Sequence, residues 1–386
     1  MTCPDCGQAA KFQGYRGKTP VSLLGEIHCA RAYYYCGHCG QGLFPWDQTV
    51  GLTANRLTPG AERVVSLAGL LSDSFAEAAE KVLPELAGLH LCESTAQRTT
   101  EDAGGRLGKL LAAGHTFGPR VHWKWHTDAQ GRTCAYVSVD ATGVRQQGPG
   151  GSLAEGRMPY VGMVYNPVPD LELPDRQPRR LAMAARYLAG LYSLDELGLQ
   201  LRRQAAQVGM EAAQLWIGLT DGGNGLEEFL QKNFPRDLVV ILDFWHAAEY
   251  LADLAKALHP RDEEQSQALT AAWSHTMKHE GGAAIIAVLE RLDLPRRQAG
   301  VRAKHEEVLA YLRNNLHRMD YPTYEANGWL IGSGAVESAC KTVVGQRLKL
   351  AGMRWGEDGT DEVCHLRALF KSECSQWPAF WDRSIN

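Results

Sequence analysis

Residues 215–243 read LWIGLTDGGNGLEEFLQKNFPRDLVVILD, and this stretch decides the predicted fold. Two short apolar runs, residues 215–219 and 238–242, have the length that is typical of buried strands. The segment between them has the spacing of a helix. A strand, a helix and a second strand in this order predict two parallel strands of one sheet. An aspartate follows each strand, Asp221 after the first and Asp243 after the second.

Three more strands are predicted upstream of this stretch. Residues 134–139 alternate apolar and small side chains and end at Asp140. Residues 160–165 and 185–191 give the second and third of these strands, and a helix follows at 193–209. We therefore predict an α/β fold with a mixed sheet, in which three strands form a meander and the last two alternate with helices. This order is the plan of a ribonuclease-H-like domain.

Acidic residues at the strand ends are the first candidates for chemistry. In open α/β sheets, sites form at the carboxyl ends of the strands, where Asp140 and Asp221 lie. Two carboxylates there, joined by a third from a neighbouring helix, can hold two Mg²⁺ ions about 4 Å apart. One ion would activate water or a sugar hydroxyl, and the other would stabilise the leaving oxygen. Taken alone, an aspartate after a strand is more often a turn former or a helix N-cap than a catalytic residue.

Four of the ten cysteines form two Cys-x-x-Cys pairs near the N-terminus, Cys3-Pro-Asp-Cys6 and Cys36-Gly-His-Cys39. Two such knuckles that face each other supply four thiolates in a tetrahedron, which suits a structural Zn²⁺. The alternative is four reduced cysteines in a small sheet, but so short a segment folds poorly without metal. The residues that could substitute as ligands are His28, Cys29 and His38.

Two regions outside the sheet are predicted to be helical. Residues 59–114 contain three short helices, with Ser74 as the N-cap of the second and Gly88 at its end. Three helices joined by tight turns fit a helix-turn-helix module, but a plain helical linker bundle fits equally well. Residues 260–324 are polar and helical throughout.

The composition of the 386 residues is that of a soluble globular protein of about two to four domains. No apolar run approaches the ~18 residues of a membrane helix, and the first residues lack the features of a secretory signal. We therefore expect a cytoplasmic protein. The net charge of −4 gives no general sign of nucleic-acid binding. The segment 341–355 contains no acidic residue and four basic ones, Lys341, Arg347, Lys349 and Arg354. Such a segment indicates either a DNA contact or a solvated helix face.

Two further motifs have less specific interpretations. His246, three residues after Asp243, either helps to position the acids or contact DNA, or satisfies a buried partner. The turn Gly332-Ser-Gly334 lacks the Lys-Ser/Thr of a P-loop, so we interpret it as a sharp entry into the last long helix.

Motifs in three regions of the chain are specific enough to suggest a family. The N-terminal ones are GEI at 25–27 and RAYY at 31–34, and the central ones are TDGGNGL at 220–226 and ILDFWH at 241–246. The C-terminal ones are HRMDYP at 317–322, IGSGAVES at 331–338, CKTVVGQRLK at 340–349 and GMRW at 352–355. These stretches resemble Kra-group bacterial insertion-sequence transposases, relatives of the Mutator superfamily. The resemblance reaches from about residue 3 to Trp381 and is weakest from 100 to 190.

The resemblance implies a ribonuclease-H-like domain with a DDE triad. Asp140 matches its first acid, Asp221 the second and Glu337, in the Gly-Ser-Gly-x-x-Glu motif, the third. Asp243 and His246 match an Asp-x-x-His element after the second acid. The family explains the long gap before Glu337 as a helical insertion. One departure is Asp140-Ala-Thr-Gly143 where the family has Asp-Gly-Thr-Gly, and the alanine should not disturb metal binding.

The expected domains follow from these motifs. They are a zinc ribbon at 1–50, a helix-turn-helix-like DNA-binding domain at 51–118, the first part of the catalytic domain at 119–259, a helical insertion at 260–328 and the last catalytic helices at 329–386.

The activity implied by the resemblance is DNA transposition, with Mg²⁺- or Mn²⁺-dependent end cleavage and strand transfer. The ribbon and residues 60–112 would recognise the terminal inverted repeats, and the four basic residues would line the DNA path. We expect a homodimer or larger assembly associated with the nucleoid. The alternatives are a ribonuclease-H-like nuclease that cleaves without joining and a domesticated DNA-binding protein that performs no chemistry.

Overall fold

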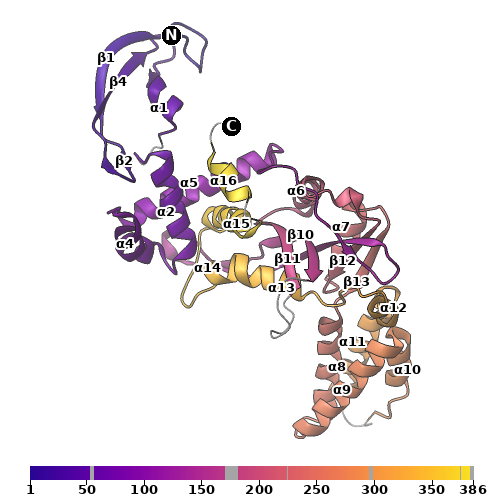
Figure 1. Cartoon of the computed structure of the whole chain (residues 1–386). Helices are drawn as coiled ribbons and strands as arrows, with labels where there is room; N and C mark the ends of the chain where they lie inside the picture. Colours follow the sequence, from indigo (N-terminus) through magenta and orange to yellow (C-terminus); the bar gives the residue numbers. More distant parts are fainter. Residues whose placement is uncertain (53–55, 170–180, 224, 295–298, 374, 383–386) are drawn as a thin grey trace.

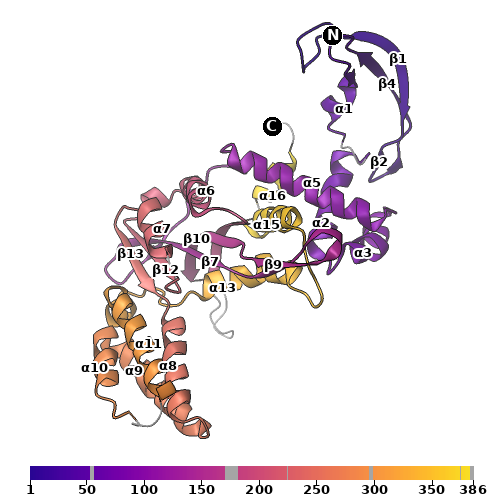
Figure 2. The same ribbon diagram turned by 180° about the vertical axis from the view of Figure 1, so that it is seen from behind.

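The structure is a computed structural model that describes residues 1–52, 56–169, 181–223, 225–294, 299–373 and 375–382. The molecule is elongated (Figure 1). A small β-rich unit at the N-terminus forms one end, and a bundle of helices forms the other. A mixed sheet with helices lies between them, and the view from behind in Figure 2 shows the same three parts. None of the described helices combines the length and apolar character that crossing a lipid bilayer requires.

The N-terminal unit is a small antiparallel sheet with strand order β1-β4-β5. Its buried centre is Cys3, Ala10, Cys36 and Leu43, which is too small a core to stabilise a domain by apolar burial alone. The elements of this unit are β1 (Lys11–Lys18), β2 (Val21–Ser22), β3 (Gly25–Glu26), β4 (Cys29–Tyr35), β5 (Gly42–Leu43) and α1 (Pro45–Val50).

Helices follow from residue 59, as predicted. The Ser74 side chain accepts a hydrogen bond from the Glu77 N–H, and Gly88 ends the second helix in the left-handed region at φ 61°. The third helix begins at Glu93, directly after Cys92. The elements are α2 (Pro59–Leu71), α3 (Phe75–Glu77), η1 (Ala78–Val82), α4 (Leu83–Ala87) and α5 (Glu93–Ala112).

The central sheet has strand order β11-β10-β7-β12-β13, with β6 paired to β7. β7, β10 and β11 form an antiparallel meander, whereas β12 runs parallel to both β7 and β13. The prediction of a mixed sheet with helices is therefore confirmed. Its strands are β6 (His126–Thr127), β7 (Thr133–Ala141), β10 (Tyr160–Pro169), β11 (Leu181–Gly190), β12 (Leu215–Thr220) and β13 (Leu238–Leu242).

β10 and β11 extend beyond the predicted strands because they pair over their whole length, from Tyr160 with Gly190 to Pro169 with Leu181. The hairpin of β8 (Val144–Gln147) and β9 (Leu153–Arg157) lies between β7 and β10 in the sequence. The short turns η2 (Pro149–Gly151) and η3 (Met210–Ala212) complete this part of the chain.

Helices cover both faces of the sheet. On one face, Gly162 of β10 packs under Leu197 and Leu201 of α6 (Leu194–Gln207), and Gly218 of β12 under Leu230 of α7 (Leu226–Asn233). α15 (Glu357–Lys371) packs on β11, and α5 packs on α15. The other face carries α13 (Gly334–Ala339), which contacts β7 and β10 and continues into η5 (Cys340–Gly345) and α14 (Gln346–Leu348). The last described helix is α16 (Gln376–Trp381).

The distal helices form the bundle at the far end of the molecule (Figure 1). α8 begins directly after β13, and the chain returns to the sheet after α12, so the bundle is inserted between β13 and α13. Its elements are α8 (Phe244–Leu258), α9 (Glu263–Glu280), α10 (Gly282–Glu290), α11 (Ala299–Asn315), η4 (Leu316–Arg318) and α12 (Tyr321–Ala326).

Candidate functional site

Asp140 and Asp221 lie at one edge of the sheet. β7 and β12 are parallel neighbours, and Ser138 pairs with Leu219. Asp140 lies two residues after Ser138, and Asp221 lies two residues after Leu219. The two aspartates are therefore at the same level of the sheet. Since alternate residues of a strand share a face, both side chains are directed to the face that Ser138 and Leu219 present.

Asp140 also contacts the helix on that face. The thiol of Cys340, the first residue of η5, donates a hydrogen bond of 3.4 Å to Asp140 Oδ2. Burial raises the pKa of the Asp140 carboxyl, and the negative charge of Asp221 raises it further. The N–H of Ala141 and the Cys340 thiol act in the opposite direction. At this edge Asp221 therefore lies close enough to Asp140 to disfavour the charged form of the Asp140 carboxyl.

Glu337 lies on α13, one turn before Cys340. Its Oε1 is 2.6 Å from Ser333 Oγ, and Ser333 Oγ is also 2.6 Å from Asp243 Oδ2. Asp243 is 1% exposed and is the N-cap of α8, where its Oδ1 accepts the Trp245 N–H. Ser333 thus links Glu337 to the end of β13.

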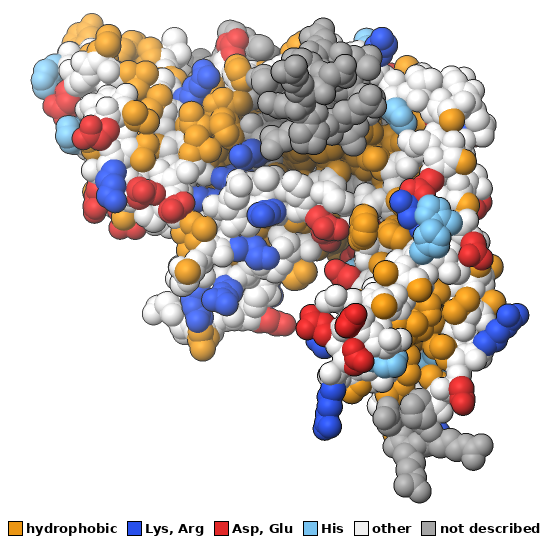
Figure 3. Space-filling view, turned by 60° about the horizontal axis from the view of Figure 1, so that its bottom comes forward, with side chains coloured by type: hydrophobic (Ala, Val, Ile, Leu, Met, Phe, Trp, Pro, Cys, Tyr) orange, Lys and Arg blue, Asp and Glu red, His pale blue; other side chains and the backbone are white. Residues whose placement is uncertain are grey.

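Asp140 and Glu337 line one open cavity of about 470 Å³. Other lining residues are Thr142, Cys340, Lys341 and Lys349, and the Lys349 ammonium donates a hydrogen bond of 2.9 Å to Thr142 Oγ1. The cavity therefore combines two carboxylates with two lysines. Figure 3 shows several Lys and Arg side chains exposed near one another on one face of the molecule.

The four basic residues of the predicted DNA path have different environments. Lys341, Lys349 and Arg354 are exposed. Arg347 is only 1% exposed, and its guanidinium binds the carbonyl oxygens of Gly69 and Asp73. In this structure Arg347 is out of reach of DNA, so we withdraw it from the expected DNA contacts.

His246 lies on the first turn of α8 and is half-buried. Its Nδ1 is 3.5 Å from Glu249 Oε2, and its ring contacts Tyr250 and Tyr311 edge to face. In its protonated form His246 would lower the pKa of Asp140. His246 therefore belongs to the surroundings of the acidic edge.

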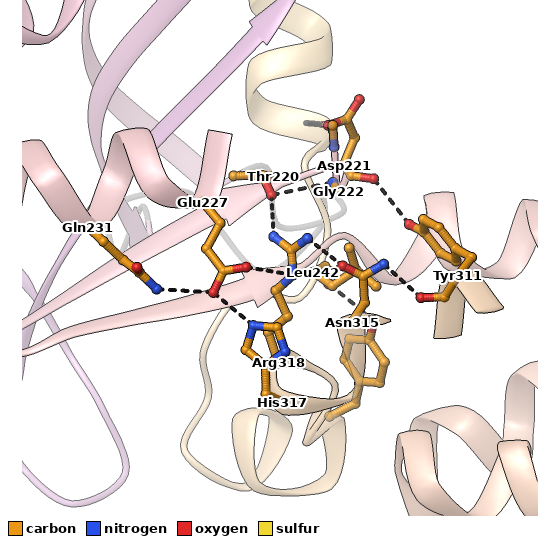
Figure 4. Close-up of polar contacts among 12 residues, drawn as sticks. Thr220, Asp221, Gly222, Glu227, Gln231, Leu242, Tyr311, Asn315, His317 and Arg318 are labelled. Carbon is orange, nitrogen blue, oxygen red and sulfur yellow. Dashed lines mark hydrogen bonds and ion pairs between the residues drawn. The ribbon is translucent and has the colours of Figure 1, made fainter. Parts of the chain in front are cut away.

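Three polar residues near this edge were not predicted from the sequence. Ser333 bridges Asp243 and Glu337, and Tyr311 and Arg318 contact the turn that carries Asp221 (Figure 4). Ser333 and Arg318 lie in the motifs IGSGAVES and HRMDYP, but these motifs did not indicate which residues the two side chains contact.

A second candidate site is formed by Cys3, Cys6, Cys36 and Cys39, whose sulfur atoms all lie within 4.8 Å of one another. Cys3 and Cys39 Sγ are 3.6 Å apart, and Cys6 and Cys36 Sγ are 3.5 Å apart. Four ligands on 2.3 Å Zn–S bonds would lie about 3.8 Å apart, so the set fits a structural Zn²⁺. The N–H groups of Cys39 and His38 lower the pKa of Cys36 to about 6, which favours a thiolate at this one of the four cysteines.

The alternative ligands stand outside this set. Cys29 Sγ donates to the Lys18 carbonyl, and His28 Nδ1 contacts Thr19 Oγ1. Among the described residues, the four cysteines are the one group of three or more His, Cys, Asp or Glu side chains that meets this 4.8 Å spacing. Asp140, Asp221 and Glu337 are spread more widely, and a divalent cation would have to draw their carboxylates together.

No protein-family model matches the chain, and no curated protein matches it.

Proposed function

We propose that this protein is an insertion-sequence transposase that cleaves and joins DNA at Asp140, Asp221 and Glu337. The observation that carries the proposal is the placement of Asp140 and Asp221 at the same edge of adjacent parallel strands, beside a helix that bears Glu337. Asp140 and Glu337 also line one cavity. The sheet order, with an antiparallel meander followed by two parallel strands, supports a ribonuclease-H-like fold.

The donor set fits Mg²⁺ or Mn²⁺. Carboxylate oxygens are the ligands that these hard cations prefer. Burial raises the Asp140 pKa and the charge of Asp221 adds to it, and a cation held by both carboxylates would offset this second effect. Two bound ions would activate the attacking oxygen and stabilise the leaving oxygen.

The residues of the chain would orient the DNA and the acids. Lys341 and Lys349 would neutralise phosphates at the cavity, and exposed Arg354 would extend this contact. The ribbon and α2–α5 would recognise the terminal repeats of the element. Two such ends must be brought together, so a homodimer or larger assembly is proposed.

The test is an assay of the full-length protein with Mn²⁺ and duplexes that carry the DNA flanking its gene. Wild type should nick the element end and join its 3′ hydroxyl to a target. Asp140→Asn and Glu337→Gln should each lower both products by about 10³-fold or more, since each removes a metal ligand. Glu228→Gln, at an exposed acid of α7, is the matched control and should leave both products unchanged.

The same assay separates the rival functions. Nicking without any joined product would support a ribonuclease-H-like nuclease. Specific DNA binding that yields neither product, with Cys36→Ser abolishing the binding, would support a DNA-binding protein without chemistry. Either result would contradict the transposase proposal.

A further inference from the structure

Two contacts from the distal helices end on the turn that carries Asp221 (Figure 4). The Tyr311 hydroxyl donates a hydrogen bond of 3.1 Å to the Asp221 carbonyl oxygen. The Arg318 guanidinium donates a bond of 3.0 Å from Nη1 to Thr220 Oγ1, which also accepts the Gly222 N–H at 3.4 Å. The main chain is therefore held on both sides of the Asp221 side chain.

The two donors are themselves held in place. The Tyr311 ring stacks on Tyr250, with ring centroids 3.9 Å apart and planes 7° apart. Arg318 is 5% exposed, and its Nε donates to Asn315 Oδ1 at 3.0 Å and lies 3.6 Å from Glu227 Oε2. Asn315 in turn donates to the Tyr311 carbonyl at 2.8 Å. Both donors thus belong to one rigid network.

A third contact reaches the next strand. The Tyr321 hydroxyl donates a hydrogen bond of 3.1 Å to the carbonyl oxygen of Leu242, the last residue of β13. Asp243 follows at once, and Ser333 connects it to Glu337. Residues 311–321 therefore anchor the ends of both β12 and β13.

The Asp221 turn needs such support. Two glycines, Gly222 and Gly223, follow Asp221, and glycine restricts the backbone least of all residues. Gly222 has φ +87°, and a Cβ there would lie 3.0 Å from Tyr311 Oη and from Leu242 Cδ1. The two glycines leave the backbone of the turn free to adopt many conformations, and its neighbours Tyr311 and Leu242 fix its position.

We propose that Tyr311, Arg318 and Tyr321 are positioning residues that hold the Asp221 turn and the end of β13 in the geometry for metal binding. The inference rests on the proposed function, since it gives the distal helices a role in ordering the acids. These side chains bind main-chain carbonyls and a threonine hydroxyl, and none of them needs to contact DNA or metal. They act through Asp221 and, by way of Asp243 and Ser333, through Glu337.

Tyr311→Phe is the sharpest test because it removes one hydroxyl and keeps the stacked ring. We expect the Mn²⁺ concentration for half-maximal nicking to rise about threefold to tenfold, as for the loss of one hydrogen bond, with the rate at saturating Mn²⁺ within about twofold of wild type. Hydrogen exchange of the Gly222 and Gly223 amides should become faster. Tyr250→Phe is the matched control, because the described structure shows no hydrogen bond from that hydroxyl, and it should change neither quantity.

Thr220 provides an independent pair of variants. Thr220→Ser keeps the acceptor for Arg318 and should behave as wild type, whereas Thr220→Val removes it and should resemble Tyr311→Phe. Unchanged amide exchange and Mn²⁺ dependence in both Tyr311→Phe and Thr220→Val would overturn the proposal, as would equal effects of Tyr311→Phe and Tyr250→Phe. If wild type shows no Mn²⁺-dependent nicking, the proposed function fails, and amide exchange alone then decides the positioning role.

Discussion

The guanidinium of Arg347 donates a hydrogen bond of 2.8 Å to the carbonyl oxygen of Gly69, 278 residues earlier in the chain. Its centre also lies 4.5 Å from the ring of Phe75 and 4.9 Å from that of Trp355. α14 is thereby joined to α2 and α3. The helices that precede the sheet are thus fixed to α14, which follows α13 and its Glu337 by way of η5. If the proposed function holds, DNA bound by these helices would lie at a defined position relative to Glu337.

Arg347→Ala should destabilise the protein. The change leaves the buried Gly69 carbonyl without its donor and removes the packing between two aromatic rings, at a cost of about 2–4 kcal/mol in the free energy of unfolding. Urea unfolding measures this loss. Arg354→Ala, at an exposed arginine of the same segment, should leave stability within about 0.5 kcal/mol of wild type and weaken DNA binding instead. Equal stability of the two variants would contradict the structural role of Arg347.

Zinc removal should unfold the N-terminal unit. Purified protein should contain one zinc per chain, bound by Cys3, Cys6, Cys36 and Cys39. Cys36→Ser should lower the zinc content and make β1 and β4 sensitive to protease, because their core is small. Elemental analysis and limited proteolysis give the two readouts. Cys29→Ser is the control, since Cys29 lies in the same sheet but outside the sulfur group, and loss of zinc there would argue against this ligand set.

The pH dependence of stability should report on Glu362 of α15. Burial and the charges of Glu101, Asp358, Asp102 and Asp361, in that order, raise its pKa from 4.5 to about 7. The folded state therefore binds this proton more tightly than the unfolded state. The stability from this group is complete below pH 4.5 and is lost as the pH rises through 7.

Glu362→Gln removes the charge and should raise the melting temperature by a few degrees at pH 8, with little gain at pH 4.5. Thermal unfolding at the two pH values measures the difference. Glu228→Gln, at an exposed glutamate, should show no such pH-dependent gain. A gain for Glu362→Gln that is equal at both pH values would show that the repulsion is absent.

Local sequence features predicted the sheet well. The apolar runs of β12 and β13 and the alternation in β7 are short-range signals, and these strands lie where they were expected. The four cysteines were also predictable, because Cys-x-x-Cys spacing itself creates a knuckle. In both cases the structural constraint lies within a few consecutive residues.

Long-range packing was not predictable in the same way. Arg347 looked like a DNA contact because its sequence neighbours are basic, but burial depends on Gly69 and Phe75, which are distant in the chain. The roles of Tyr311 and Ser333 likewise depend on where α11 and α13 meet the strand ends. Periodicity indicates that a helix forms, but it does not say which residues its side chains contact.

The contact of α5 with α15 offers a last prediction about how the helical segment is joined to the sheet. Gly104 of α5 is buried, and a Cβ there would lie 2.2 Å from the main-chain oxygen of Glu362. Since a backbone oxygen cannot rotate away, Gly104→Ala should separate the two helices and lower the free energy of unfolding by about 1–3 kcal/mol. Gly300→Ala in α11, where a Cβ meets nothing within 4 Å, should leave stability unchanged or raise it by up to about 1 kcal/mol. Urea unfolding of both variants decides the matter: if Gly104→Ala is as stable as Gly300→Ala, close contact of the two backbones does not hold α5 on α15.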